Sequence, residues 1–159
     1  MFKSSKRGKI LIGIGSNLRG HMNNPKDNLK IVFNYLQRNG LRVEKFSKTY
    51  ISRPYPKRLG PLFYNSVVLI KSDMYANDIL NRLKKIEILF GRRNTIRNSP
   101  RVLDLDLIDC RGEVKNLKNK LILPHPRLYL RDFVLYPILE INPMWKDPIS
   151  YRNIRSLLN

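Results

Sequence analysis

The segment from Pro100 to Cys110 reads Pro-Arg-Val-Leu-Asp-Leu-Asp-Leu-Ile-Asp-Cys and alternates apolar residues with carboxylates. Such alternation is typical of a strand, because successive side chains of a strand point to opposite faces. Asp104 and Asp106 are therefore predicted to share one face, and the leucines around them are predicted to face a core. Carboxylates two residues apart on a strand lie about 7 Å from each other, close enough to hold divalent cations against a phosphate.

An Asp-x-Asp pair by itself has a more common explanation. Structural carboxylates that bind nearby lysines or arginines occur more often than metal sites do. The choice between the two therefore depends on the rest of the chain.

Length and charge limit the class of protein. The chain has 159 residues, of which 42% are hydrophobic, which is enough for one sizeable core. We expect a single domain over residues 1–159, with its core in about 10–143. Lysine and arginine total 31 against 12 acids, a formal charge of +19, so the expected partner is anionic: nucleotide phosphate, nucleic acid or an acidic surface.

The single cysteine and the first apolar run indicate the compartment. Cys110 has no cysteine to pair with inside the chain, which fits a reducing compartment and ordinary packing in a strand. The run from Ile10 to Ile14 is too short for a signal-peptide core or a membrane span. We therefore expect a cytoplasmic protein with no membrane contact.

Periodicity and turn residues predict the order of elements. Asn24-Pro25 is typical of a helix start, and Gly40 and Gly91 are placed to end helices. The expected elements are a strand at 9–14, a helix at 25–38, strands at 41–51 and 63–70, a helix at 76–90 and a strand at 100–110. This βαββαβ order predicts an α+β, ferredoxin-like sandwich with a C-terminal extension that packs beside it. The last stretch, residues 138–159, contains Trp145 and a polar, helix-compatible tail, and no chemistry is evident in it.

The usual nucleotide-binding loops are absent from the sequence. Leu18 occupies the third glycine position after the Gly13-x-Gly15 pair, and no Gly-x-x-x-x-Gly-Lys-Ser/Thr segment occurs. A bound nucleotide would therefore be held by other means.

Several residues have both a functional and a structural interpretation. Phe63 and Asn65 share a strand face, which suits a flat heterocycle that stacks and forms hydrogen bonds, although such a ring is more often part of a core. Glu87 lies on the apolar stripe of a helix, and the four arginines of loop 91–101 could grip phosphates or simply face solvent. His125 is fixed between two prolines but, as a lone histidine, is usually structural.

Seven segments together resemble one family, 6-hydroxymethyl-7,8-dihydropterin pyrophosphokinase of folate biosynthesis. They run in the family's order from about residue 10 to 143, and the ordered set is far more specific than any single piece. The segments are Gly15–Leu18, Tyr50–Pro54, Phe63–Asn65, Ile86–Glu87 with Gly91–Arg92, Pro100–Asp106, Leu123–Arg127 and Arg131–Val134.

The resemblance implies transfer of a pyrophosphoryl group from ATP to the hydroxymethyl group of a reduced pterin, with release of AMP. Asp104 and Asp106 match the pair that holds two Mg²⁺ ions on the ATP phosphates. Either carboxylate could also help to deprotonate the hydroxyl, and Asp106 is favoured over Asp104. Arg92 and Arg101 complete the implied catalytic set. The implied partners are these two small molecules, and we expect a monomer that does not bind nucleic acid.

The resemblance also assigns the remaining site residues. The positions implied for the pterin are Gly15, Ser52, Tyr55, Phe63, Asn65 and Phe133. The positions implied for ATP are Glu87, Arg92, Arg101, Leu107, His125 and Arg131.

The chain departs from the family pattern in its loops. Asn94 stands where the family usually has an arginine, Asn98-Ser99 replaces a common Trp-Gly pair, and Pro56 replaces a glycine. These changes leave open a catalytically weakened relative that binds ATP or pterin without turnover. The high charge leaves open a second alternative, a ferredoxin-like nucleic-acid-binding domain.

Overall fold

The computed structural model describes residues 8–17, 24–54, 59–91, 102–118 and 120–158. The core elements follow the expected βαββαβ order, and their strands form an antiparallel sheet in the order β2-β4-β1-β5. The ferredoxin-like α+β prediction is therefore confirmed. The elements are β1 (Ile10–Ser16), α1 (Pro25–Arg38), β2 (Arg42–Phe46), β3 (Tyr50–Ser52), β4 (Phe63–Lys71), α2 (Ala76–Leu89) and β5 (Asp104–Cys110).

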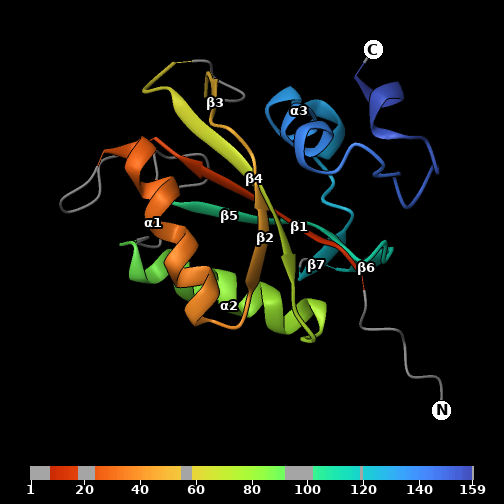
Figure 1. Ribbon diagram of the computed structural model, residues 1–159, viewed down its shortest axis with the longest axis horizontal. Helices are drawn as coiled ribbons and strands as arrows, with labels where there is room; N and C mark the ends of the chain where they lie inside the picture. The colour runs from red at the N-terminus through yellow and green to blue at the C-terminus, as the bar shows by residue number, and fades with distance from the viewer. Residues whose placement is uncertain (1–7, 18–23, 55–58, 92–101, 119, 159) are drawn as a thin grey trace.

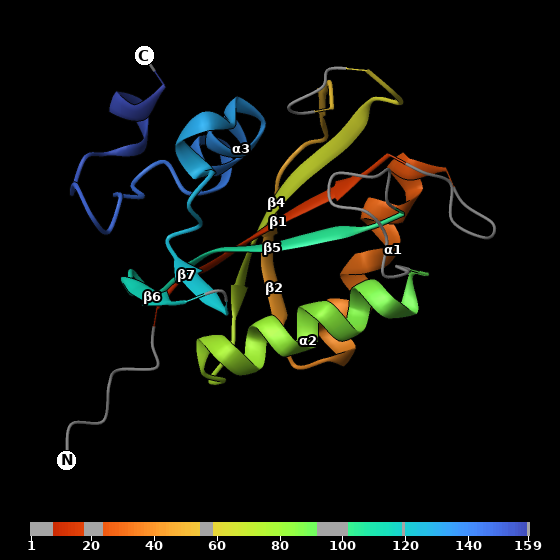
Figure 2. The same cartoon turned by 180° about the vertical axis from the view of Figure 1, so that it is seen from behind.

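Helices α1 and α2 cover one face of the sheet, as Figures 1 and 2 show from opposite sides. The predicted leucine row of β5 lies in this layer: Leu105 and Leu107 are buried against residues such as Val32 and Leu83 of the helices. Asn24 accepts a hydrogen bond from Asp27 N at 2.9 Å and so caps α1 where the Asn-Pro signal predicted its start. Burial of the leucines holds the alternate residues of β5, including both aspartates, on the opposite face.

The C-terminal segment covers the other face of the sheet (Figure 1). Helix α3 (Asp132–Ile141) and the short 3-10 helix η2 (Ile154–Leu157) pack against Leu11 and Val67 of the sheet. The predicted C-terminal extension thus packs beside the domain, as expected. Its description as a polar tail missed Trp145 and Ile154, which are fully or nearly buried in this second core. Apolar residues spaced through a polar segment gave too weak a periodicity to reveal this layer.

The strand predicted at 41–51 is two strands separated at Ser47. β2 pairs with the C-terminal half of β4, and β3 pairs with residues 63–65. Between them the Ser47 hydroxyl accepts a hydrogen bond from Val67 N at 3.0 Å and lies 2.9 Å from Ser66 Oγ. A side chain thus replaces a backbone acceptor of the ladder, which a residue-by-residue propensity cannot predict.

A small hairpin follows β5. It is formed by β6 (Lys115–Leu117) and β7 (Leu121–Leu123), neither of which was expected from the sequence. Three residues per strand are too few to show a period of two. The 3-10 helix η1 (Leu128–Leu130) then leads into α3.

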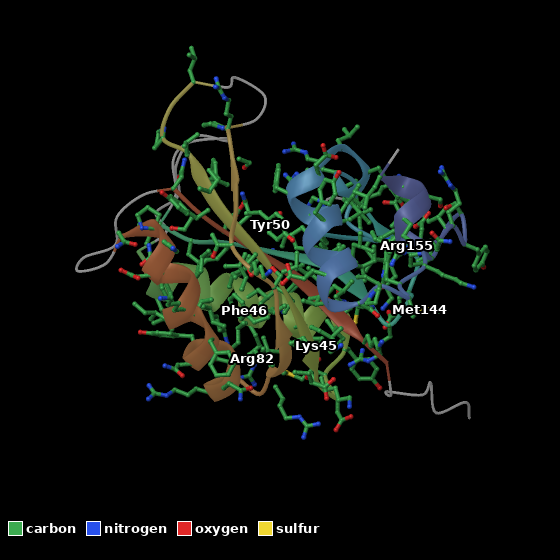
Figure 3. All side chains as sticks on the ribbon, turned by 45° about the horizontal axis from the view of Figure 1, so that its top comes forward. Lys45, Phe46, Tyr50, Arg82, Met144 and Arg155 are labelled. Atoms are coloured by element: carbon green, nitrogen blue, oxygen red, sulfur yellow. The ribbon has the colours of Figure 1, made fainter. Side chains whose placement is uncertain are left out.

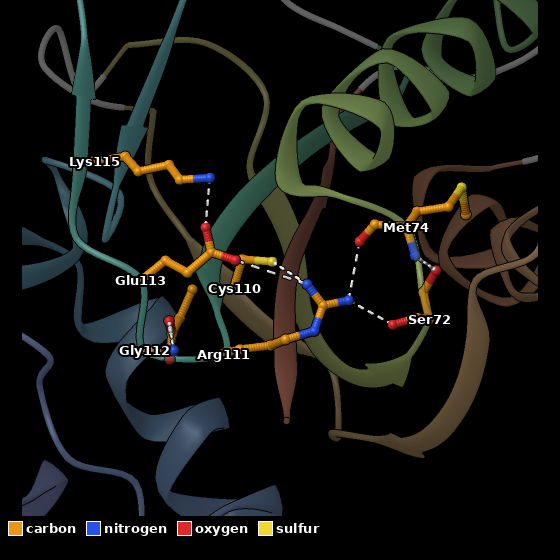
Figure 4. Close-up of polar contacts among 8 residues, drawn as sticks. Ser72, Met74, Cys110, Arg111, Gly112, Glu113 and Lys115 are labelled. Carbon is orange, nitrogen blue, oxygen red and sulfur yellow. Dashed lines mark hydrogen bonds and ion pairs between the residues drawn. The ribbon is translucent and has the colours of Figure 1, made fainter. Parts of the chain in front are cut away.

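Arg111 ties the end of β5 to the connection between β4 and α2 (Figure 4). Its guanidinium donates hydrogen bonds to the carbonyl oxygens of Ser72 and Met74, and Nη1 lies 3.2 Å from Cys110 Sγ. Burial raises the pKa of the Cys110 thiol to about 11. This thiol is therefore protonated at neutral pH and serves as a packing residue, as predicted.

Candidate active site

A cavity of about 370 Å³ opens where β1, β4 and β5 meet the start of α3. Residues from both sequence-derived groups, those for the pterin and those for ATP and metal, line this one cavity. They are Gly15, Ser52, Phe63, Asn65, Asp104, Asp106, His125, Arg131 and Phe133. Tyr55, Arg92 and Arg101 lie outside the described residues, as do Pro56, Asn94 and Asn98.

Strand register explains why residues distant in sequence meet here. On β1, Gly15 is paired with Asn65 of β4 on one side and with Asp104 of β5 on the other. A Cβ atom at Gly15 would lie 3.5 Å from Asn65 Oδ1 and 3.7 Å from Phe63 Cδ1. A longer side chain at this position would therefore occupy space between the amide, the ring and the carboxylate.

Asp106 is the centre of the charged part of the cavity. Its Oδ2 accepts a hydrogen bond from Arg131 Nη1 at 2.9 Å, and its Oδ1 lies 3.7 Å from His125 Nε2. Arg131 also lies 5.7 Å from the ring centroid of Phe133. The acidic strand, the Pro-His-Pro segment and the start of α3 thus converge on one carboxylate.

The ring of His125 is held in one tautomer. Arg127 N donates a hydrogen bond to Nδ1 at 3.2 Å, so in the neutral ring the proton lies on Nε2, the nitrogen nearer Asp106. Burial lowers the pKa of His125, and the nearby Asp106 carboxylate only partly opposes this effect. His125 is therefore a neutral hydrogen-bond donor facing the cavity at neutral pH.

The side-chain amide of Asn65 is fixed by hydrogen-bond acceptors on β3 and β4. Its Nδ2 donates to Ser52 Oγ at 2.9 Å and to the Tyr50 carbonyl oxygen at 3.2 Å. The donor end of the amide is thereby used within the protein. The acceptor oxygen lies beside Gly15 and is placed to accept a hydrogen bond from a ligand in the cavity.

Glu87 and Leu107 lie behind the acidic pair rather than among the residues that line the larger cavity. Glu87 is 3% exposed, and its Oε1 accepts a hydrogen bond at 2.7 Å from the backbone N–H of Leu105, the residue between the two aspartates. Leu107 lines a second hollow of about 280 Å³ with Leu80 and Ile122. Both hollows share Asp106 and His125, so they are adjacent.

Several residues that line the cavity were missing from the sequence-derived set, among them the polar residues Asn17, Arg53 and Arg127. Each of these three residues belongs to a segment that carried the family resemblance, so the sequence could have identified them through that segment. Arg53 and Arg127 add positive charge around the acidic pair, which suits an anionic ligand.

The donor set suits magnesium that shares its coordination with a substrate. Within the described ranges no group of three or more His, Cys, Asp or Glu residues is arranged to hold a metal ion. Mg²⁺ is usually held by one or two carboxylates together with substrate phosphates and water. Asp104 and Asp106, both facing the cavity, match that requirement.

A ferredoxin-like domain with carboxylates, cations and aromatic rings around one cavity has the features of an enzyme acting on charged, flat small molecules. A family comparison makes this class specific. Residues 11–143 match 7,8-dihydro-6-hydroxymethylpterin-pyrophosphokinase (HPPK). The chain belongs to this family, as the resemblance predicted.

Relatives of known name agree with this membership. The chain is similar to the 2-amino-4-hydroxy-6-hydroxymethyldihydropteridine pyrophosphokinase of Aquifex aeolicus, with 31% identity over 92% of this chain and 88% of that protein. A folate synthesis bifunctional protein of Arabidopsis thaliana is 36% identical over 84% of this chain but only 27% of its own length. The chain thus spans about a quarter of the plant relative and most of the Aquifex protein.

Solved structures support the fold. The HPPK-DHPS of Plasmodium falciparum with pteroate superposes with a TM-score of 0.74 at 14% identity, over 95% of this chain and 44% of that one. Identity this low is evidence for the shared architecture alone.

Proposed function

We propose that this chain transfers the pyrophosphoryl group of ATP to the hydroxymethyl group of 6-hydroxymethyl-7,8-dihydropterin and releases AMP. The observation that carries the proposal is the single cavity that contains Asp104 and Asp106 together with Phe63, Asn65 and Phe133. Carboxylates suited to metal–phosphate binding and a wall suited to a flat heterocycle lie in one hollow, in a chain of the matching family.

The reaction defines what each group must do. The hydroxymethyl oxygen attacks the β-phosphorus of ATP, the bond from that phosphorus to the α,β-bridging oxygen breaks, and AMP leaves. The hydroxyl proton passes to a base, for which we propose Asp106. Arg131 and the neutral His125, together with Arg92 and Arg101, supply donors for the charge that spreads over the phosphate oxygens.

We propose two Mg²⁺ ions held by Asp104 and Asp106 on the ATP phosphates. When bound, the ions would neutralise phosphate charge and bring the β-phosphorus within reach of the hydroxyl. Arg131, which donates a hydrogen bond to Asp106, would then be available to the phosphates. Pterin binding is assigned to Gly15, Ser52, Tyr55, Phe63, Asn65 and Phe133, and ATP binding to Arg92, Arg101, Leu107, His125 and Arg131. For Glu87, which the resemblance places at ATP, we propose a supporting role instead, because it is buried against the backbone of Leu105.

The alternative of a nucleic-acid-binding domain has little support in the architecture. Ferredoxin-like domains that bind RNA stack bases on an open sheet face. Here α3 and the segment after it cover that face, and Leu11, Val67 and Leu69 beneath them are buried.

None of the helices in the described part of the chain has the length and apolar character that a membrane span requires. We propose a cytoplasmic monomer acting on small molecules.

The deciding experiment measures AMP release from ATP and the pterin substrate, with and without magnesium. We expect AMP and the pyrophosphorylated pterin in equal amounts, and only when the metal is present. Binding of both substrates without AMP release would instead identify a weakened relative. Salt-sensitive RNA binding without AMP release would favour the nucleic-acid alternative.

A further inference from the structure

We infer that Glu140, in the last turn of α3, is a positioning residue for the pterin side of the cavity. The inference rests on the proposed function. The Glu140 carboxylate accepts a hydrogen bond from the Tyr50 hydroxyl at 2.8 Å and from the backbone N–H of Lys48 at 3.1 and 3.3 Å. One side chain of α3 thus binds both the entrance to β3 and β3 itself, and Figure 3 shows Tyr50 alongside this helix.

β3 needs such support because it is short. It has three residues and, within the described part of the chain, pairs with β4 alone. A ladder of three residue pairs gives little independent stability. α3 also contacts β2, the strand that precedes β3, since Lys45 Nζ donates to the carbonyl oxygen of Ile141 at 3.2 Å. Contacts with the end of α3 therefore fix the position of β3.

The position of β3 in turn sets the geometry of the ligand-facing groups. The Tyr50 carbonyl and the Ser52 hydroxyl accept the hydrogen bonds that orient the amide of Asn65. At its other end α3 presents Phe133 to the same cavity. Glu140 therefore holds two walls of the cavity in register, one from β3 and β4 and one from α3, without touching the ligand.

The protonation states at neutral pH favour this contact. Burial and the hydrogen bond to Glu140 both raise the pKa of Tyr50 above its ordinary value of 10.0. The hydroxyl therefore keeps its proton and remains a donor to an ionised carboxylate, the stronger kind of hydrogen bond. Misplacement of a substrate-positioning wall by about 1 Å is enough to reduce reaction efficiency.

The test compares Glu140→Gln, Tyr50→Phe and the double variant. Gln keeps the length of the side chain but has one acceptor oxygen, and Phe removes only the hydroxyl. We expect each single variant to raise the KM for the pterin about three- to tenfold, with the KM for ATP and the magnesium dependence unchanged. Because the Tyr50 hydroxyl acts through its hydrogen bond to Glu140, the double variant should raise this KM no further than the larger single effect.

Glu44→Gln is the matched control. Glu44 is a carboxylate on β2 that binds Lys71 at 2.7 Å and does not line the cavity. The Glu44→Gln variant should leave the KM for the pterin and the KM for ATP unchanged. If Glu140→Gln does not fold, as judged by its thermal unfolding, Tyr50→Phe at the other end of the bond decides the question.

If the unaltered protein is active, two results would overturn this inference while leaving the proposed function intact. One is an unchanged KM for the pterin in both single variants. The other is an equal increase in the KM for the pterin and the KM for ATP. Equal increases would indicate general loosening of the fold. Absence of AMP release by the unaltered protein would overturn the proposed function, and the inference with it.

Discussion

At the scale of single residues, the surroundings of Asp104 and Asp106 bear on the choice between two interpretations of the pair, a metal site and structural ion pairs. Asp106 binds Arg131, as the structural interpretation requires, yet both carboxylates face a cavity instead of being enclosed. Carboxylates paired only for stability have no need of an adjacent hollow lined by aromatic rings. The cavity therefore favours a substrate-linked role for the pair.

Replacing either aspartate should abolish magnesium-dependent turnover with little change in folding. For Asp104→Ala and Asp106→Ala we expect AMP release to fall by about 10²-fold or more, because metal coordination supplies several kcal/mol of transition-state stabilisation. The thermal unfolding midpoint should stay close to that of the unaltered protein. Asp78→Ala, in the exposed first turn of α2, is the control. Full activity in either cavity variant would remove the metal assignment.

Removing the ring of Phe133 should affect one substrate only. For Phe133→Ala we expect the KM for the pterin to rise about tenfold, since a stacked aromatic pair contributes roughly 1 kcal/mol beyond its buried area. The KM for ATP should not change. Tyr136→Ala removes an exposed ring from the same helix and should be neutral. A comparable rise in both KM values would argue against a separate pterin wall.

At the scale of elements, β5 is held from both sides. Its leucines pack on α1 and α2, and Glu87 of α2 accepts the backbone N–H of Leu105. The bond fixes the backbone at the residue between the two aspartates. The sequence placed Glu87 on the apolar stripe of a helix, and the family resemblance implied a role at ATP. The structure gives it a buried partner on the strand.

Glu87 variants should distinguish loss of an acceptor from loss of charge. In Glu87→Leu the buried N–H of Leu105 loses its acceptor, which should lower the free energy of unfolding by about 1–3 kcal/mol and reduce turnover. Glu87→Gln retains an amide oxygen and should preserve more of the stability. Chemical denaturation with a parallel activity assay measures both effects. Equal stability of the two variants would show that the hydrogen bond contributes little.

At the scale of the whole molecule, a buried carboxylate joins the sheet to the C-terminal layer. Trp145 Nε1 donates to Asp109 Oδ2 at 2.8 Å, and Gly112 N donates to Oδ1 at 2.9 Å. Burial outweighs these two hydrogen bonds and raises the pKa of Asp109 above its ordinary value of 3.8. The segment from α3 onward is thus attached through polar as well as apolar contacts.

This pKa shift predicts the sign of one pH effect on stability. Above about pH 4 the unfolded chain has lost the Asp109 proton, whereas the folded protein retains it until its raised pKa is passed. Stability from this group therefore falls as the pH rises through that window. Asp109→Asn lacks this titrating group. Between about pH 4 and pH 7 the midpoint temperature of thermal unfolding should therefore fall further in the unaltered protein than in the variant. Parallel pH profiles would contradict the assignment.

The sequence alone determined the βαββαβ order, the shared face of Asp104 and Asp106, and the shared face of Phe63 and Asn65. These features follow from local periodicity and from the ordered segments that resemble the family. The tertiary structure decided how the segments meet. Strand register places Asn65 and Asp104 on either side of Gly15, and the start of α3 brings Arg131 and Phe133 to the same cavity.

The break at Ser47, the second core under α3 and the Glu140 contact also appear only in the folded chain. Each depends on contacts between residues far apart in sequence, whereas periodicity reports only which face of its own element a side chain occupies.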